Sequence, residues 1–339
     1  MLCLPLALCQ DMAELAGVAS TDSVTQLTQL LPVPEYTEQL LEGLVASVGG
    51  VDASLAKAVS AALVEVVNNP ASSTLSSLGD APDLAKEALL ASIALQLLRV
   101  WMRHAKSARM AGPLLRSGSL LVSKTQLLTA TVSAEVAAAA LAVAKPATAV
   151  AAAVTAGAGE SAASSGSAVP LPDVLVEVVR AETRQCTDVA RLLDAATLLC
   201  HLMPCANPCH CSAVQGLLVL LVSRYPKVRR HTAEQLYLQM LAMEPEQLPG
   251  SSAHSGAAPA APVSAEDLEQ AQELLLTTCW DGDLDAAKAA RDSLATLLRV
   301  PLPAMKVAAP GAAGAGKAVR DENASYAALV MDFHRGFGM

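Results

Sequence analysis

The segment from residue 32 to residue 70 constrains the fold of this chain more than any other segment does. Apolar residues recur at helical spacing over Tyr36–Val48, and the pattern ends at Gly49-Gly50, a pair suited to a helix C-terminus. A second helical pattern opens at Asp52, which favours the N-cap position, and continues to about Val67. Two helices joined by a glycine turn form an αα-hairpin, the unit that HEAT-like solenoids stack.

Composition and periodicity predict helices along most of the chain. Hydrophobic residues make up 53% of the 339 residues, much of that is alanine, and only 2% are aromatic. Alanine is the best helix former and buries little area, so many closely packed helices are favoured over sheet. Further helices are expected at about residues 83–106, 110–116, 119–136, 173–182, 187–203, 212–224, 228–243, 264–277 and 283–298. The predicted fold class is all-α, a HEAT/armadillo-like α-solenoid of stacked helical hairpins with low-complexity insertions.

Two stretches lack the large apolar side chains that would stabilise an ordered fold, and they divide the helical regions. The expected organisation is a poorly defined N-terminal segment (1–35), helical hairpins (36–136), an Ala/Gly/Ser low-complexity insertion (137–170), helical hairpins (171–248), a disordered insertion (249–263), a last helical hairpin (264–305) and a flexible tail (306–339). The chain length fits two ordinary domains or one extended array of repeats.

Charge and targeting signals exclude several classes of protein. A net charge of −9 and a pI near 5.2 argue against binding to nucleic acid, which requires a basic surface. The apolar start lacks the basic residues of a signal peptide, and the alanine stretch 132–154 contains Glu135, Lys145 and Pro146, so neither secretion nor membrane insertion is expected. Eight cysteines without a secretion signal then indicate free thiols and a cytoplasmic location.

Three patterns that would suggest an enzyme are weak. The cysteines and histidines of Cys200–Cys211 have ligand types that zinc uses, but no second pair with regular spacing follows, so helix-end and loop thiols are the favoured interpretation. Residues 311–317 resemble the front of a P-loop, but Ala318 replaces the hydroxyl that holds magnesium and no strand precedes it. The six histidines fit no catalytic motif. We therefore predict no enzyme activity, no metal and no cofactor.

The segment 225–237 has the pattern of the second helix of a HEAT repeat. Pro226 suits the first turn of a helix, Val228 and Leu236 are expected to point inward, and the small Ala233 permits close helix packing. The basic residues beside them have two interpretations, a solvated helix face or a rim that contacts an acidic partner. The candidates for partner contact here are Arg224, Lys227 and Arg230, whereas Arg229 is expected to tie adjacent repeats together.

A second marked helix start lies at Trp280-Asp281. Acidic Asp283 and Asp285 come early in this helix and Arg299 comes late, an order that complements the helix dipole. Trp280 is expected to anchor the last hairpin in the core, and the alternative is that Trp280 and Asp281 contact a partner.

Several segments together resemble the carboxyl-terminal region of the tubulin-folding cofactor D family. The resemblance runs from about residue 36 to residue 305 with gaps at 137–170 and 249–262, and the loop 204–211 departs from the family pattern. Its segments are Leu40–Gly50, Val174–Met203, Arg224–Leu241 and Thr277–Pro303, of which the last two are the most specific.

This resemblance implies a function that the residue patterns alone do not give. Proteins of the family are large non-enzymatic α-solenoids that capture β-tubulin and, with tubulin-folding cofactors E and C and an Arl-type small GTPase, assemble the αβ-tubulin heterodimer. With cofactor C they also promote GTP hydrolysis by tubulin. The resemblance therefore implies a tubulin-folding chaperone of the cytoplasm, with microtubules or the centrosome as further locations. The alternative is a generic α-solenoid adaptor or a scaffold for a small GTPase, without contact to tubulin.

Overall fold

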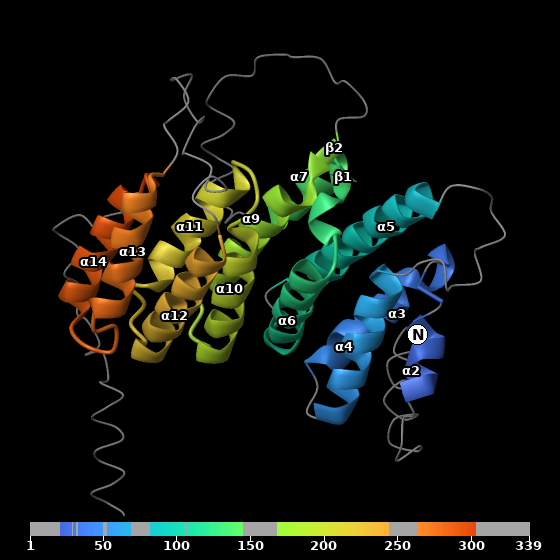
Figure 1. The fold of residues 1–339 in the computed structure, drawn as a ribbon. Helices are drawn as coiled ribbons and strands as arrows, with labels where there is room; N and C mark the ends of the chain where they lie inside the picture. The colour runs from blue at the N-terminus through green and yellow to red at the C-terminus, as the bar shows by residue number, and fades with distance from the viewer. Residues whose placement is uncertain are drawn as a thin grey trace, which may run out of the picture. The chain divides into compact units, whose positions relative to one another are not determined.

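The computed structural model describes residues 21–28, 30–31, 33–49, 53–68, 82–105, 107–144, 168–243 and 263–302. These residues form twelve α-helices, one short 3-10 helix and two strands of three residues each (Figure 1). The all-α fold class predicted from the sequence is confirmed.

The elements have the following bounds in chain order: α2 (Thr21–Thr28), α3 (Pro34–Val48), α4 (Ala53–Asn68), α5 (Pro82–Arg103), α6 (Ala108–Lys124), η2 (Leu127–Thr129), β1 (Thr131–Ser133), α7 (Ala134–Ala144), β2 (Ala168–Pro170), α9 (Leu171–Thr183), α10 (Val189–Leu202), α11 (Cys209–Leu220), α12 (Pro226–Ala242), α13 (Ala265–Thr277) and α14 (Leu284–Leu297).

The helices between α3 and α12 pack in two layers. Helices α3, α5, α7, α9 and α11 contact one another in series, and so do α4, α6, α10 and α12 (Figure 1). The layers join through pairs such as α3 with α4, α9 with α10, and α11 with α12. Each helix therefore buries one face against its own layer and another against the facing layer. This nearest-neighbour stacking is the arrangement of an α-solenoid.

The core lies between these layers and consists mostly of leucine, valine and alanine. Trp101 of α5, Leu114 of α6 and Leu198 of α10 are all buried. Small residues bring the helices close together. A Cβ on Gly118 of α6 would lie 3.2 Å from the Leu198 side chain, and one on Gly216 of α11 would lie 2.9 Å from Leu199.

One prediction about secondary structure is wrong in detail, since the described residues contain a short antiparallel β-ribbon. Strand β1 pairs with β2, with Val132 opposite Val169. Val132 is buried, and the Leu171 amide donates a hydrogen bond to the Ala130 carbonyl at 3.0 Å. The partner strand lies more than 30 residues further along the chain, so no local alternation in the sequence revealed the pairing.

The helices expected at 110–116 and 119–136 are a second correction. A single helix, α6, covers residues 108–124, and residues 127–133 form η2 and β1 instead of helix. In the sequence, Gly118 suggests a boundary between two helices. In the structure it stands inside α6, where it packs against Leu198 with almost no room for a side chain. The helix ends where the Thr125 hydroxyl donates to the Leu121 carbonyl at 2.6 Å.

The starts of the last helices agree with the sequence signals. Pro226 stands in the first turn of α12. The Ser264 hydroxyl caps α13 by accepting a hydrogen bond from the Asp267 amide at 3.0 Å, and the Asp283 carboxylate caps α14 by accepting from the Ala286 amide at 3.4 Å. Asp52, the expected cap of α4, lies outside the described residues.

The low-complexity insertions expected from the sequence coincide only in part with the residues that lie outside the described ranges. Helix α7 continues to Ala144, so the first eight residues of the expected insertion 137–170 are helical, and its last three form β2. Residues 145–167, 244–262 and 303–339 lie outside the described part of the chain, as do residues 1–20. No helix in the described ranges is long and apolar enough to cross a membrane.

Candidate partner-binding surface

Arg229 of α12 is buried and ties the last two hairpins together. Its guanidinium donates hydrogen bonds to three carbonyl oxygens, those of Trp280 (2.8 Å), Gly282 (2.8 Å) and Ser223 (2.9 Å). The arginine side chain therefore satisfies the backbone of the α13–α14 turn from the start of α12. The expectation that Arg229 ties adjacent repeats together is confirmed.

The three basic residues proposed for partner contact are exposed but differ in their pairing. Arg224 stacks on the ring of Tyr225, with its guanidinium carbon 4.6 Å from the ring centroid, and bonds the Tyr225 hydroxyl. Lys227 is exposed, and no ion pair to it occurs among the described residues. Arg230 pairs with Glu234 at 2.8 Å and with Asp281 at 3.5 Å, so two carboxylates neutralise it. Arg224 and Lys227 therefore remain as positive charges that a partner could reach.

Trp280 has the position expected of a core anchor. Its side chain is 6% exposed, and its indole N–H donates to the Leu275 carbonyl at 2.9 Å. Asp281, the next residue, is exposed and faces Arg230. Of the candidates for partner contact, Asp281 is therefore at the surface and Trp280 supports that surface from below.

A groove lies between α12 and α13, and three of the candidate residues line it. Its volume is about 520 Å³. Arg230 and Glu234 come from the first half of α12, Leu238 and Leu276 form apolar walls, and Trp280 and Asp281 complete the lining. We call this the α12–α13 groove. Its shape and apolar lining suit a helix or extended peptide better than a small polar substrate.

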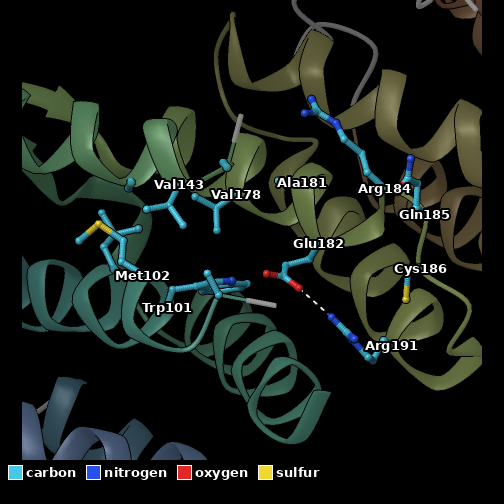
Figure 2. Close-up of a pocket in the computed structure, with 14 residues that line it drawn as sticks. Trp101, Met102, Val143, Val178, Ala181, Glu182, Arg184, Gln185, Cys186 and Arg191 are labelled. Atoms are coloured by element: carbon cyan, nitrogen blue, oxygen red, sulfur yellow. Dashed lines mark hydrogen bonds and ion pairs between the residues drawn. The ribbon is translucent and has the colours of Figure 1, made fainter. Parts of the chain in front are cut away.

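A second cavity of about 430 Å³ lies where α5, α7, α9 and α10 meet (Figure 2). Trp101 and Met102 of α5 line one side, and Val143 of α7 and Val178 of α9 line another. Figure 2 shows the nitrogen edge of the Trp101 indole turned toward Glu182. That buried nitrogen has no hydrogen-bond partner among the described residues.

The polar side of this cavity holds an ion pair between α9 and α10. Arg191 Nη2 lies 2.7 Å from Glu182 Oε2, and the two side chains are only 16% and 10% exposed. Gln185, in the turn between the helices, has a positive φ of 58°. Since the Arg191 guanidinium neutralises Glu182, this arrangement supplies a structural tie between the helices of one hairpin.

The cysteine and histidine cluster at residues 200–211 lies at the end of α10 and the start of α11. Burial raises the pKa of the Cys200 thiol to about 12, and the Cys209 thiol donates to the Pro172 carbonyl at 3.5 Å. His210 is buried, with Nδ1 2.6 Å from the Met203 carbonyl, and burial lowers its pKa. No group of three potential ligands that could hold a metal ion occurs among the described residues. The cluster packs as helix-end and core side chains.

Sequence reasoning did not identify the leucines of the α12–α13 groove. Leu238, which lines the groove, stands off the buried stripe of α12, which runs through Val228, Ala233 and Leu236. The exposed Leu241, three residues later, lies outside the groove and also stands off that stripe. Apolar residues on the polar face of an amphipathic helix are the signal that could have revealed them. The Trp101 cavity carries no comparable signal, because its walls come from four helices far apart in the sequence.

Residues 7–156 match the family model described as tubulin folding cofactor D C terminal. The family resemblance is thereby confirmed over residues 36–136, which include Leu40–Gly50, most of α3 and helices α4 to α6. The match also covers residues 7–35 and 137–156, which the resemblance had left out. The segments Val174–Met203, Arg224–Leu241 and Thr277–Pro303 lie beyond the matched residues, and their correspondence to the family stays a prediction. No solved structure matches the chain.

Proposed function

We propose that this chain is a non-enzymatic helical scaffold in tubulin folding, with roles in β-tubulin capture and in assembly of the αβ-tubulin heterodimer. The observation that carries the proposal is the match of residues 7–156 to the tubulin folding cofactor D C-terminal family. The stacked helices support it, since an α-solenoid presents extended surfaces that suit the handling of a large protein partner.

The proposal includes partners and a location. Tubulin-folding cofactors E and C and an Arl-type small GTPase act with the chain, and stimulation of GTP hydrolysis by tubulin passes through these partner cofactors. The chain works in the cytoplasm, with microtubules or the centrosome as further locations.

The surface proposed for contact with tubulin is the exposed basic pair Arg224 and Lys227. Tubulin is acidic and this chain carries a net charge of −9, so a local positive surface is needed against the overall repulsion. Arg230 contributes less to this surface because Glu234 and Asp281 already neutralise it.

Co-purification from cytosol tests the proposal and its alternative. Tubulin together with cofactors E and C in the recovered complex supports a role in tubulin folding. Recovery of a small GTPase without tubulin or its cofactors would favour the generic adaptor. An Arg224→Glu/Lys227→Glu double variant should recover less tubulin, whereas Lys57→Glu/Arg99→Glu, which makes the same change of charge at exposed positions of α4 and α5, serves as the charge control.

A further inference from the structure

Two of the three most exposed large apolar side chains of the described residues line the α12–α13 groove, and the third lies on the same helix as one of them. Leu276 is 64% exposed, Leu238 is 56% exposed and Leu241 is 55% exposed. Leu238 and Leu241 are three residues apart and therefore share one face of α12. Leu238 and Leu276 line the groove directly. A contiguous apolar surface with polar residues around it marks an interaction site more often than a chance exposure.

The charges around this apolar surface are predominantly negative. The only cation that lines the groove among the described residues, Arg230, is matched by the carboxylates of Glu234 and Asp281. The exposed Glu269 and Glu273 stand seven and three residues before the groove leucine of α13, so they lie on the same side of that helix. Lys227 stands three residues before Arg230 on the same side of α12 and adds one positive charge. The four carboxylates of Glu234, Glu269, Glu273 and Asp281 still outnumber these two cations, so the rim carries an excess of negative charge.

We propose that the α12–α13 groove binds an amphipathic helix of a partner protein, with leucine-like side chains on its apolar face and lysine or arginine beside them. Two helices with a shallow apolar groove between them accept a third helix through contacts spaced at i, i+3, i+4 and i+7. Basic flanks complement the carboxylate rim, which would repel an acidic segment or an anionic lipid surface. This partner chemistry is opposite to that of the acidic tubulin surface proposed for Arg224 and Lys227.

The test uses the whole chain, labelled with ¹⁵N, and two synthetic helical peptides with the same leucine stripe. One peptide carries lysine on its flanks and the other carries glutamate. The chain has two tryptophans, and the indole N–H of Trp280 reports on the groove that it lines, while that of Trp101 serves as the reference. The lysine peptide should shift the Trp280 signal in a saturable way, less strongly at higher salt, and should leave Trp101 unchanged.

Variants at the exposed leucines separate the groove from binding elsewhere. The Leu238→Ser/Leu276→Ser double variant should bind the lysine peptide with an affinity about tenfold lower or more, because two apolar contacts are lost. Both side chains are largely exposed, so the fold and the Trp101 signal should persist. Val219→Ser on α11 is the matched control, because this side chain is 46% exposed and does not line the groove. This variant should bind the lysine peptide as the original chain does.

Several results would overturn the proposal. Equal or tighter binding of the glutamate peptide would show that the carboxylate rim does not select a basic partner. An unchanged affinity of the double leucine variant for the lysine peptide would show that the peptide binds outside the groove. A chain that sediments as a dimer and becomes monomeric in that variant would assign the groove to a second copy. A change of the Trp280 signal on replacement of residues 244–262 by a glycine/serine segment of equal length, without peptide, would assign the groove to the chain's own segment.

Discussion

Arg229 Nε donates a hydrogen bond to the carbonyl oxygen of Trp280 at 2.8 Å, across 51 residues of sequence. The contact joins the start of α12 to the turn between α13 and α14. One buried guanidinium therefore fixes the geometry of the surface on which Arg230 and Asp281 lie.

Replacement of Arg229 by alanine should destabilise the fold by about 3 kcal/mol. The change leaves three carbonyl oxygens without their donor and opens space beside Trp280. Urea unfolding followed by circular dichroism measures the loss. Arg230→Ala, at the next residue, is the control and should change the midpoint little, because that guanidinium is at the surface. Equal effects of the two changes would contradict the structural role of Arg229.

Trp280→Ala should cost about 3–5 kcal/mol, the usual range for truncation of a buried aromatic residue. Trp280→Phe keeps a ring in the core but loses the bond to the Leu275 carbonyl, so its cost should be about 1 kcal/mol. The free energy of unfolding of the three proteins checks this order. A loss below about 1 kcal/mol in the alanine variant would show that Trp280 contributes little to the core.

Two glycines of the first hairpin should respond to alanine in opposite directions. A Cβ on Gly49, after the end of α3, would lie 2.3 Å from Pro113 Cγ and 2.8 Å from Pro113 Cα, so Gly49→Ala should destabilise. A Cβ on Gly43, inside α3, meets nothing within 4 Å, and Gly43→Ala should stabilise by about 0.5–1 kcal/mol through helix propensity. Thermal melts compare the two variants. A Gly49→Ala variant as stable as the original chain would show that α3 does not approach α6 this closely, whereas a destabilising Gly43→Ala would show that the space beside Gly43 is not open.

Stability should fall as the pH drops below about 6.5, in part because of His210. Burial lowers the pKa of this imidazole below its ordinary value, so the folded chain keeps it neutral while the unfolded chain takes up a proton. The contribution is fully present above the unfolded pKa and is lost as the pH falls from there toward the lower folded pKa. Each such histidine contributes at most about 1.4 kcal/mol per pH unit. His201, whose pKa burial also lowers, acts in the same direction.

The slope of unfolding free energy against pH, from 7.5 to 5, measures this effect. His210→Asn retains an N–H donor for the Met203 carbonyl but does not titrate, so its slope should be smaller than that of the original chain. An unchanged slope would show that His210 does not titrate differently in the two states.

Much of the helical fold could be predicted from local signals. The residue types of Pro226, in the first turn of α12, and Asp283, the cap of α14, already indicate a helix start. The inward positions of Val228 and Ala233 follow from helical periodicity. The β1–β2 pairing was missed because register between strands far apart in the sequence depends on the surrounding helices. The continuity of α6 was missed because the contact of Gly118 with Leu198 is tertiary.

The candidate surface was predictable only in part. The exposure of Arg224 and Lys227 follows from their place beside the turn that Pro226 begins. The ion pair of Arg230 with Asp281 depends on how the α13–α14 turn docks on α12, and no local pattern encodes that docking. The α12–α13 groove depends in the same way on two helices whose connection spans residues 244–262.

Sedimentation velocity of the purified chain mixed with purified αβ-tubulin tests the central proposal most directly. We expect a complex that sediments faster than either protein, whose amount falls as salt rises and in the Arg224→Glu/Lys227→Glu variant. Circular dichroism of each sample shows that the helices are intact. Independent sedimentation of the two proteins at low salt, with the helical signal unchanged, would contradict a role of this chain in binding tubulin.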